Sequence, residues 1–197
     1  EITLLGQNVN SYGRDLYGSP RFAQILKALD ETGVERLRFA TSHPKDLSDE
    51  VIAQCGSLRS LMPALHLPAQ SGSDRILQLM NRRYTSAHYR QLVSKLRDAC
   101  PDIALSTDII VGFPGETEKD FMDTARLVDE IGYHQVFTFI YSKREGTPAA
   151  SMEDNTPHEV IQKRFDRLVD IVQAHAFEKN QLDLGATIPV LVEGSSK

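Results

Sequence analysis

Apolar and polar positions along the chain follow two periods, the alternation of a β-strand and the 3.6-residue repeat of a helix. Strands are predicted at residues 2–5, 37–40, 64–67, around 109–111, and at 135–141. Helices are predicted at residues 22–32, 49–57 and 86–99, and in two segments that begin after Ser73 and Thr117. Strands that alternate with helices are typical of βαβ units, so the pattern predicts an α/β fold with a parallel sheet.

The clearest of these units lies between residues 104 and 120. An apolar run at 109–111 is followed by the turn Gly-Phe-Pro-Gly at 112–115. Thr117 and Asp120 then stand at capping-box spacing before a helical pattern. The stretch therefore predicts a buried strand, a glycine turn and a helix N-terminus in direct succession.

Every predicted strand but the last is followed by a turn rich in Gly, Pro, Ser or Asn. The carboxyl ends of parallel strands carry binding sites because the loops there lie on a rigid scaffold. The turns should therefore bring their polar groups together at one edge of the sheet. These groups are Gln7, Asn8, Ser42, His43, Gln70, Ser71, Thr107, Asp108 and Glu116.

The last part of the chain predicts a loop, a long helix and one strand. Residues 142–155 are irregular, and Thr156 and Pro157 suit the N-cap and first position of a helix that ends near Gly185. Residues 187–192 (TIPVLV) then predict a strand. One strand cannot form an independent domain, so we interpret residues 185–197 as the start of a truncated β domain and residues 1–184 as the α/β domain.

Composition narrows the class of protein. The chain is 41% hydrophobic and 25% charged with a net charge of −5, which suits a globular protein and gives no general basic field for nucleic acid. No apolar run approaches the ~20 residues that span a bilayer. Two cysteines outside any paired motif favour a cytosolic setting. The chain begins within a strand-like run and without Met, so we expect a piece of a longer protein.

The residues leave several chemical alternatives open. The six histidines have no metal-binding spacing, and Cys55 and Cys100 suit structural positions. The glycine turn lacks the lysine of a phosphate-binding loop. Asp108 next to a buried strand needs a partner, which is either a ligand hydroxyl or a neighbouring group. Residues 82–84 (Arg-Arg-Tyr) are either an RNA contact or a solvated loop.

Several ordered segments together resemble the radical S-adenosylmethionine (SAM) methylthiotransferases. The resemblance covers nearly the whole chain. Its motifs are LLGQNVNSY at 4–12, HLPAQSGSD at 66–74 with MNR at 80–82 and YT at 84–85, STDIIVGFPGET at 106–117, FTFIYS at 137–142 and GTPA at 146–149. The first motif resembles the branch of the family that acts on isopentenyl-adenosine in tRNA.

The resemblance implies a partial (β/α) barrel, with about five of the six units of a radical SAM core, followed by the first strand of a TRAM domain. It implies a tRNA-modifying transferase that adds a methylthio group to C2 of isopentenyl-adenosine beside the anticodon. The implied cofactors are SAM and two [4Fe-4S] clusters. The implied partners are tRNA and an electron donor such as flavodoxin or ferredoxin, in the cytoplasm and without a membrane.

One departure from the family pattern matters. The CxxxCxxC loop that holds the family's cluster is absent, and Cys55 and Cys100 have neither its spacing nor its place. We therefore expect no metal ligands and no catalytic residue in this chain, and no activity from the chain alone. An open strand edge near Ile2 also favours pairing with a second copy in a crystal.

By resemblance, the SAM contacts would come from the strand ends. Gln7 and Asn8 would meet the methionine amino group. The carboxylate, ribose and adenine would lie against Ser42, Gln70, Ser71, Asp108, Ile110, Gly112 and Tyr141. Arg82, Arg83 and Tyr84 are the candidate RNA contacts. Two alternatives remain: the same reaction on threonylcarbamoyl-adenosine tRNA or a ribosomal protein, and a non-catalytic module that binds a nucleotide or a protein.

Overall fold

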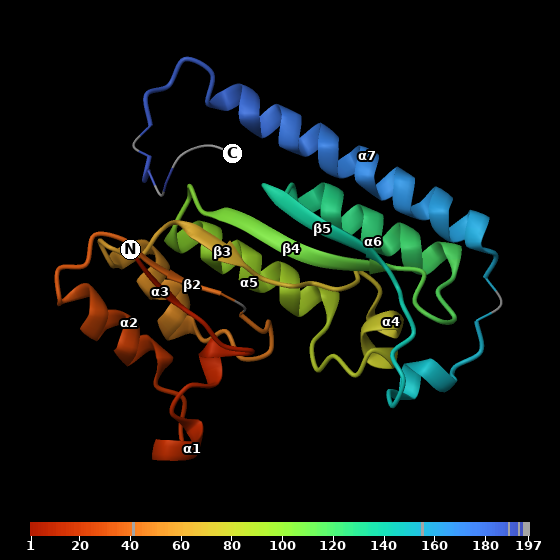
Figure 1. Ribbon diagram of the computed structural model, residues 1–197, viewed down its shortest axis with the longest axis horizontal. Helices are drawn as coiled ribbons and strands as arrows, with labels where there is room; N and C mark the ends of the chain where they lie inside the picture. The colour runs from red at the N-terminus through yellow and green to blue at the C-terminus, as the bar shows by residue number, and fades with distance from the viewer. Residues whose placement is uncertain (41, 155, 189, 193, 195–197) are drawn as a thin grey trace.

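The computed structural model describes residues 1–40, 42–154, 156–188, 190–192 and 194. Strands and helices alternate along the chain, as Figure 1 shows. The strands are β1 (Ile2–Leu4), β2 (Leu37–Phe39), β3 (Ala64–His66), β4 (Ala104–Val111) and β5 (Gln135–Ile140). The helices are η1 (Val9–Ser11), α1 (Arg14–Tyr17), α2 (Phe22–Asp30), α3 (Asp49–Ser57), α4 (Asp74–Leu79), α5 (Ser86–Ala99), α6 (Glu118–Ile131), η2 (Pro148–Ser151) and α7 (His158–Leu182).

The strands run parallel in two sheets, β1-β2 and β3-β4-β5. A parallel bridge links Leu37 of β2 to Leu61, just before β3, and the Ser42 N–H donates to the His66 carbonyl at 3.4 Å. The order of the strands in space therefore follows their order in the chain. This arrangement places the turns that follow the strands at one edge of the molecule.

Helices cover one face of each sheet. α5 and α6 lie behind the strands β3-β4-β5 in Figure 1, and α7 packs along β5 and α6. α2 and α3 lie beside β1 and β2. One cluster of buried side chains runs from Phe22 on α2 to Leu168 on α7, so a single core joins both sheets.

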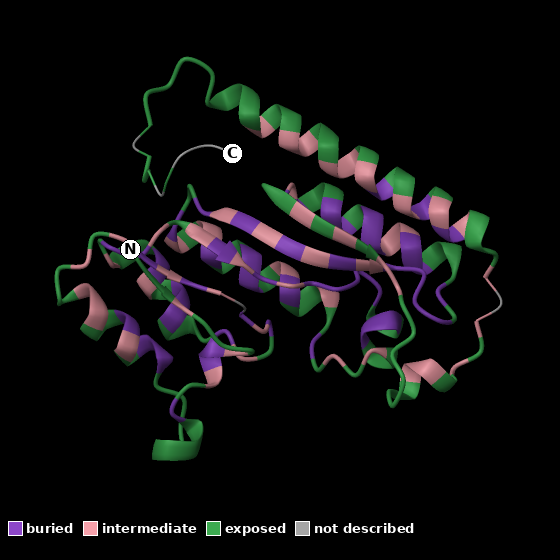
Figure 2. Ribbon diagram, viewed as in Figure 1, coloured by how far each residue is buried: buried purple, intermediate pink, exposed green. Residues whose placement is uncertain are grey.

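Burial alternates along β4, as the banding in Figure 2 shows. Leu105, Thr107, Ile109 and Val111 are buried on the helix side. The opposite face of β3-β4-β5, which we call the open face, carries half-buried or exposed side chains. They are His66, Ser106, Asp108, Ile110, Phe137 and Phe139. The open face is therefore the part of the sheet that is available to a ligand.

The helices at 49–57 and 86–99 begin and end where the sequence predicts. Ser73 caps α4, and Thr117 with Asp120 forms the predicted capping box of α6. The N-terminus of α7 was predicted one residue too early, because Pro157 occupies the N-cap position given to Thr156. The short helices η1, α1 and η2 were not predicted, since each has too few residues for a periodic pattern.

The strand predicted at 187–192 is absent from the described residues of that segment, which leave out Pro189. Its side chains are exposed, among them Ile188 at 62% and Val192 at 80%. A strand needs a partner to bond its backbone, and none of the described strands lies in register with it. Apolar sequence alone therefore did not make a strand here.

Among the described helices, none combines the length and the hydropathy that a bilayer span requires.

Candidate functional site

The turn after β4, residues 112–117, is held by its own neighbours. We call it the β4 turn. The backbone of Gly112 has a φ of +71°, and its N–H donates to Glu116 Oε2 at 3.0 Å. A Cβ at this position would lie 2.6 Å from Ile161 Cγ2 of α7. Only glycine therefore suits both the conformation and the packing.

A buried arginine on α7 completes this turn. Arg164 Nη1 donates to the Glu116 carbonyl at 3.1 Å and to Glu116 Oε2 at 3.2 Å, while its Nε donates to Glu118 at 3.1 Å. Burial raises the pKa of the Glu116 carboxyl, although the Gly112 N–H and Arg164 oppose that shift. The sequence pattern does not predict this role of Arg164, because a lone arginine in an amphipathic helix is typical of a solvent-exposed position.

Asp120 ties the β4 turn to the turn after β3. It accepts hydrogen bonds from Ser73, Thr117 and Arg75, and Arg75 also donates to the Gly115 carbonyl at 2.6 Å. Burial alone would raise the pKa of Asp120, but these hydrogen bonds outweigh it and hold the pKa well below its usual range. The two turns are therefore fixed relative to each other.

Gln70 and Ser71 follow β3 at this junction. Gln70 has a φ of +65°, which is rare for a residue other than glycine, and its backbone bonds to Asp108 and Ile110 of β4. Such conformations concentrate at functional sites. The Ser71 hydroxyl lies 3.0 Å from the Thr124 hydroxyl and is buried against α6. The Ser71 side chain is thus already engaged within the protein.

The turn after β1, residues 6–11, is held less completely. We call it the β1 turn. Asn8 donates to Asp46 at 2.6 Å, and Gln7 is exposed. Asn8 Oδ1 and both side-chain polar atoms of the buried Asn10 find no hydrogen-bond partner among the described residues. An unpaired buried polar group is costly, so these atoms mark a place where an outside partner would stabilise the protein.

Ser42 and Tyr141 add two more such groups. The Ser42 hydroxyl is fully buried, and neither it nor the Tyr141 hydroxyl has a partner among the described residues. Tyr141 packs edge-on against Phe113 of the β4 turn, with ring centroids 5.1 Å apart. Both residues follow strands, so their polar atoms belong to the same edge of the molecule as the two turns.

Asp108 and Ile110 lie on the open face of β4. Asp108 Oδ2 is 3.4 Å from His66 Nε2, and His66 Nδ1 is 3.0 Å from the Ser106 hydroxyl. A neighbouring side chain is therefore one partner of Asp108, as one of the two alternatives predicted. His66 is not among the predicted site residues, although it lies in the motif HLPAQSGSD.

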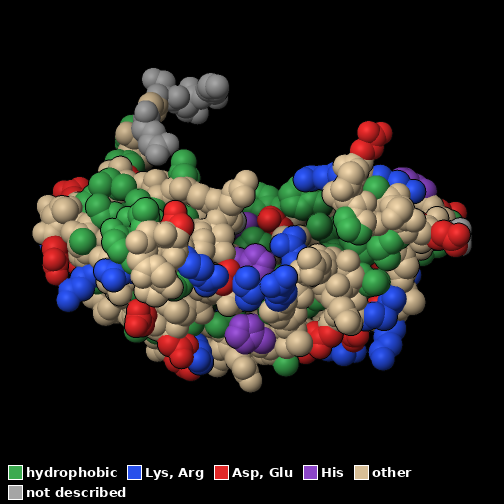
Figure 3. Space-filling model, turned by 90° about the horizontal axis from the view of Figure 1, so that it is seen from below, with side chains coloured by type: hydrophobic (Ala, Val, Ile, Leu, Met, Phe, Trp, Pro, Cys, Tyr) green, Lys and Arg blue, Asp and Glu red, His purple; other side chains and the backbone are tan. Residues whose placement is uncertain are grey.

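The three candidate RNA contacts are placed differently from one another. Arg83 is exposed and Arg82 is half-buried. Tyr84 is buried, its hydroxyl donates to the Ala69 carbonyl at 3.1 Å, and its ring packs against His43. The Tyr84 ring therefore does not lie on the surface where a base could stack. Figure 3 shows basic and histidine side chains gathered at the middle of the lower face.

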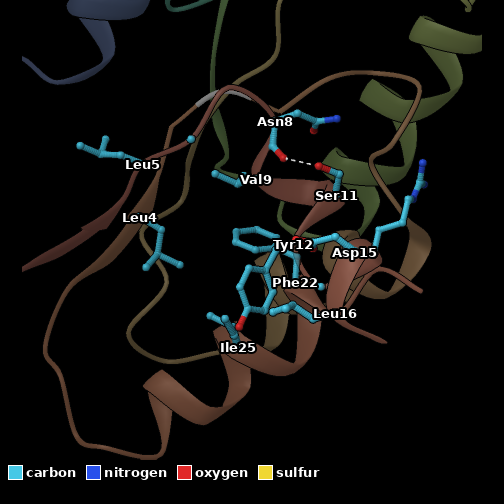
Figure 4. A pocket seen from close by; sticks show the side chains of 13 residues that line it. Leu4, Leu5, Asn8, Val9, Ser11, Tyr12, Asp15, Leu16, Phe22 and Ile25 are labelled. Atoms are coloured by element: carbon cyan, nitrogen blue, oxygen red, sulfur yellow. Dashed lines mark hydrogen bonds between the residues drawn. The ribbon is translucent and has the colours of Figure 1, made fainter. Parts of the chain in front are cut away.

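An apolar hollow lies beside η1, close to the β1 turn. Leu4, Val9, Tyr12, Phe22 and Ile25 line it, and Figure 4 shows Leu5 pointing away from them. The hollow contains Asn8 at its margin but not the residues of the β4 turn. Apolar side chains predominate in its lining, which also includes Arg14 and Asp15.

The cysteines do not fit an iron-sulfur cluster, whose irons are held by thiolates. Cys55 and Cys100 are buried in the core, and burial raises the pKa of Cys55 to about 12. No group of His, Cys, Asp and Glu side chains suited to a metal occurs among the residues that the structure describes. The strand ends therefore carry polar side chains, and neither cysteine suits a cluster.

The sequence matches the family model described as the radical SAM superfamily over residues 1–128. The chain belongs to that superfamily. The fold agrees, because the coproporphyrinogen III oxidase of Escherichia coli, a radical SAM enzyme, is similar over 80% of this chain and 37% of its own, with a TM-score of 0.55 and 17% identity. At that identity the likeness concerns the fold alone, and it supports the partial radical SAM barrel.

Curated relatives are more similar in sequence. Three bear the name tRNA-2-methylthio-N(6)-dimethylallyladenosine synthase and align with 100% of this chain. They come from Acetivibrio thermocellus (52% identical), Clostridium botulinum (54%) and Caldicellulosiruptor saccharolyticus (53%). The chain spans 41%, 44% and 42% of their lengths, respectively.

Proposed function

We propose that the chain is the central part of a tRNA methylthiotransferase, which adds a methylthio group to C2 of isopentenyl-adenosine beside the anticodon. The observation that carries this proposal is the 52–54% identity over the whole chain with synthases of that name. The residues of both turns lie within the aligned region. Because the chain spans less than half of these relatives, the activity is proposed for the longer protein.

We propose that SAM lies across the strand ends. Gln7 and Asn8 would hold its methionine end, and the nucleoside would lie against Ser42, Gln70, Ser71, Asp108, Ile110, Gly112 and Tyr141. Polar atoms of Asn8, Ser42 and Tyr141 have no partner among the described residues, and this supports the fit because a polar ligand would satisfy them. Ser71 would contribute through its backbone, since its hydroxyl is engaged by Thr124. SAM would supply the methyl group and the radical chemistry.

The remaining parts of the proposal concern groups beyond these contacts. Ligands for the two [4Fe-4S] clusters would come from cysteines outside this chain, because Cys55 and Cys100 do not fit. A reductant such as flavodoxin or ferredoxin would serve the clusters, in the cytoplasm where tRNA is found. Residues 185–197 would begin a TRAM domain, and the exposed side chains of Ile188 and Val192 are consistent with a segment that packs on something else.

The test is nucleoside analysis by mass spectrometry of tRNA from a strain that lacks the gene. We expect isopentenyl-adenosine to accumulate there, and the methylthio form to return when the full-length gene is restored. Unchanged isopentenyl-adenosine after restoration would overturn the proposal. Loss of methylthiolation from threonylcarbamoyl-adenosine or from a ribosomal protein would assign the protein to another branch of the family.

A further inference from the structure

The open face carries a polar cluster that the proposed cofactor contacts do not include. His66 lies on β3 opposite Ser106 of β4, and Asp108 is two residues further along β4, opposite Phe137 of β5. His66 Nδ1 is 3.0 Å from Ser106 Oγ, and His66 Nε2 is 3.4 Å from Asp108 Oδ2. The Phe137 ring packs edge-on against the imidazole at 6.0 Å. Three strands therefore hold the imidazole in one orientation.

The chemistry of these groups selects one tautomer of His66. An ionised carboxylate only accepts hydrogen bonds, so the 3.4 Å contact favours the tautomer in which the nitrogen that faces Asp108 carries the proton. In a neutral imidazole the other nitrogen is then an acceptor, and the Ser106 hydroxyl can donate to it. Ser106 thus stabilises the form of His66 that presents an N–H to Asp108.

The cluster is accessible rather than sealed in the core. The side chains of His66 and Asp108 are 26% and 29% exposed, on the face that none of the described helices covers. Within the described residues, the Asp108 carboxylate accepts no hydrogen bond, and the one basic group that faces it is His66 Nε2 at 3.4 Å. One carboxylate oxygen therefore faces the imidazole, while the other can accept from a ligand.

We propose that His66 is a positioning residue for Asp108. With Ser106 it fixes the carboxylate so that the free oxygen accepts a hydrogen bond from a ribose hydroxyl of a bound nucleoside. Carboxylates serve ribose hydroxyls in this way in other nucleotide sites. The inference rests on the proposed function, because the nucleoside is taken to be that of SAM. It adds a residue and a mechanism of orientation to that site.

The first experiment is a double-mutant cycle in the full-length, cluster-loaded protein, with SAM binding measured by equilibrium dialysis. We expect His66→Ala and Asp108→Asn each to weaken binding about tenfold, and the double variant to bind no more weakly than either single variant. Independent effects that multiply in the double variant would overturn the proposal. Circular dichroism of each variant would confirm that the fold is kept.

A conservative variant separates positioning from simple packing. The amide nitrogen of His66→Gln can donate to Asp108 from the place that Nε2 occupies, so binding should stay within about twofold of the unchanged protein. Binding by His66→Gln that is as weak as that of His66→Ala would contradict the proposal. His134→Ala is the matched control, because this exposed histidine bonds to Leu105 at the other end of β4. It should bind SAM normally.

A ligand that lacks the ribose hydroxyls tests whether Asp108 accepts a hydrogen bond from one of them. S-adenosylhomocysteine and its 2′,3′-dideoxy analogue should differ about tenfold in affinity for the unchanged protein and hardly at all for Asp108→Asn or His66→Ala. Equal affinity of the two ligands for the unchanged protein would overturn the assignment to ribose. Methylthiolation of tRNA by the unchanged protein is measured in parallel. If methylthiolation occurs but the effects of the two substitutions multiply, only the inference about His66 is refuted. If the effects of the two substitutions are coupled but no methylthiolation occurs, the inference about His66 stands and the proposed function is refuted.

Discussion

The β4 turn and the β1 turn both follow parallel strands, yet they are built in opposite ways. In the β4 turn, Glu116 binds the Gly112 N–H, Arg164 binds Glu116, and Asp120 caps the next helix. In the β1 turn, the side chain of buried Asn10 and one oxygen of Asn8 have no partner among the described residues. Among the described residues, the polar side chains of one turn have their partners, whereas several polar atoms of the other do not.

This difference indicates which of the two turns has its final conformation before a ligand binds. A turn whose buried polar groups are all bonded keeps one conformation without a ligand, because any rearrangement leaves a group unpaired. A turn with unpaired buried groups gains free energy when a partner arrives. We therefore expect the β4 turn to act as a rigid platform and the β1 turn to be stabilised by what binds there. Substitutions in the two turns should have different effects on stability.

The largest effect on stability is expected at Arg164, because the β4 turn depends on its buried charge. Arg164→Met would leave Glu116 buried without its cation, and breaking a buried pair in this way costs about 3–5 kcal/mol. The free energy of unfolding, measured by urea denaturation, should fall by that amount. The stability loss is expected because the Glu116 carboxylate also holds the Gly112 N–H.

Arg167→Met is the matched control for this change. Arg167 lies three residues further along α7, its side chain is 54% exposed, and it reaches Glu118 only at 4.0 Å. Exposed pairs of this kind contribute about 0–1 kcal/mol. Equal losses in the two variants would mean that the β4 turn does not depend on Arg164, and the contrast between the turns would fail.

The next effect tests the close approach of α7 to the turn. Gly112→Ala should cost about 1–2 kcal/mol for the left-handed backbone, and about 1–3 kcal/mol more for the overlap with Ile161. Gly115→Ala shares the positive φ, but a Cβ there would meet nothing within 4 Å, so it should show only the backbone cost. The difference between the two variants in urea denaturation therefore measures the packing of Ile161 on the turn.

This result also changes how a bulky residue at position 112 should be interpreted. A valine at position 112 of the proposed site would abolish methylthiolation if it blocked the approach of a ligand. The structure puts Ile161 of α7 where that side chain would go. Loss of activity in Gly112→Val would therefore report a displaced helix as well as a blocked site, and the Gly115→Ala control is needed to separate them.

The features that the sequence predicts are those whose residues lie close together in the chain. The capping box of α6 and the cap of α4 were predictable, because the residues involved lie within three positions of each other. Arg164 and Glu116 are 48 residues apart, and their pairing depends on how α7 packs on β4 and α6. No local pattern carries that information. The prediction of a strand at 187–192 was wrong for the converse reason. The local pattern suits a strand, but none of the described strands pairs with this segment.

The candidate site shows the same division. The glycine turn and the strand-end polar groups could be predicted from alternation and turn residues. The pairing of His66 with Asp108 could not, because it depends on the register between β3 and β4, which sets residue 66 beside residue 106. The burial of Tyr84 could not be predicted from the sequence either, because a tyrosine next to two arginines does not indicate contact with the turn after β3.

The smallest expected effect has the opposite sign and tests the β1 turn. Asn10→Leu replaces two buried polar atoms, unpartnered among the described residues, by an apolar side chain of similar size. Removing an unsatisfied polar group in this way is nearly neutral or stabilising, so the free energy of unfolding should stay equal or rise by about 1 kcal/mol. Asn8→Leu is the control, because it removes the bond to Asp46 and should lower stability by about 1–3 kcal/mol. If Asn10→Leu instead destabilised the chain as much as Asn8→Leu does, Asn10 would have partners of its own. The β1 turn would then be as complete within the chain as the β4 turn.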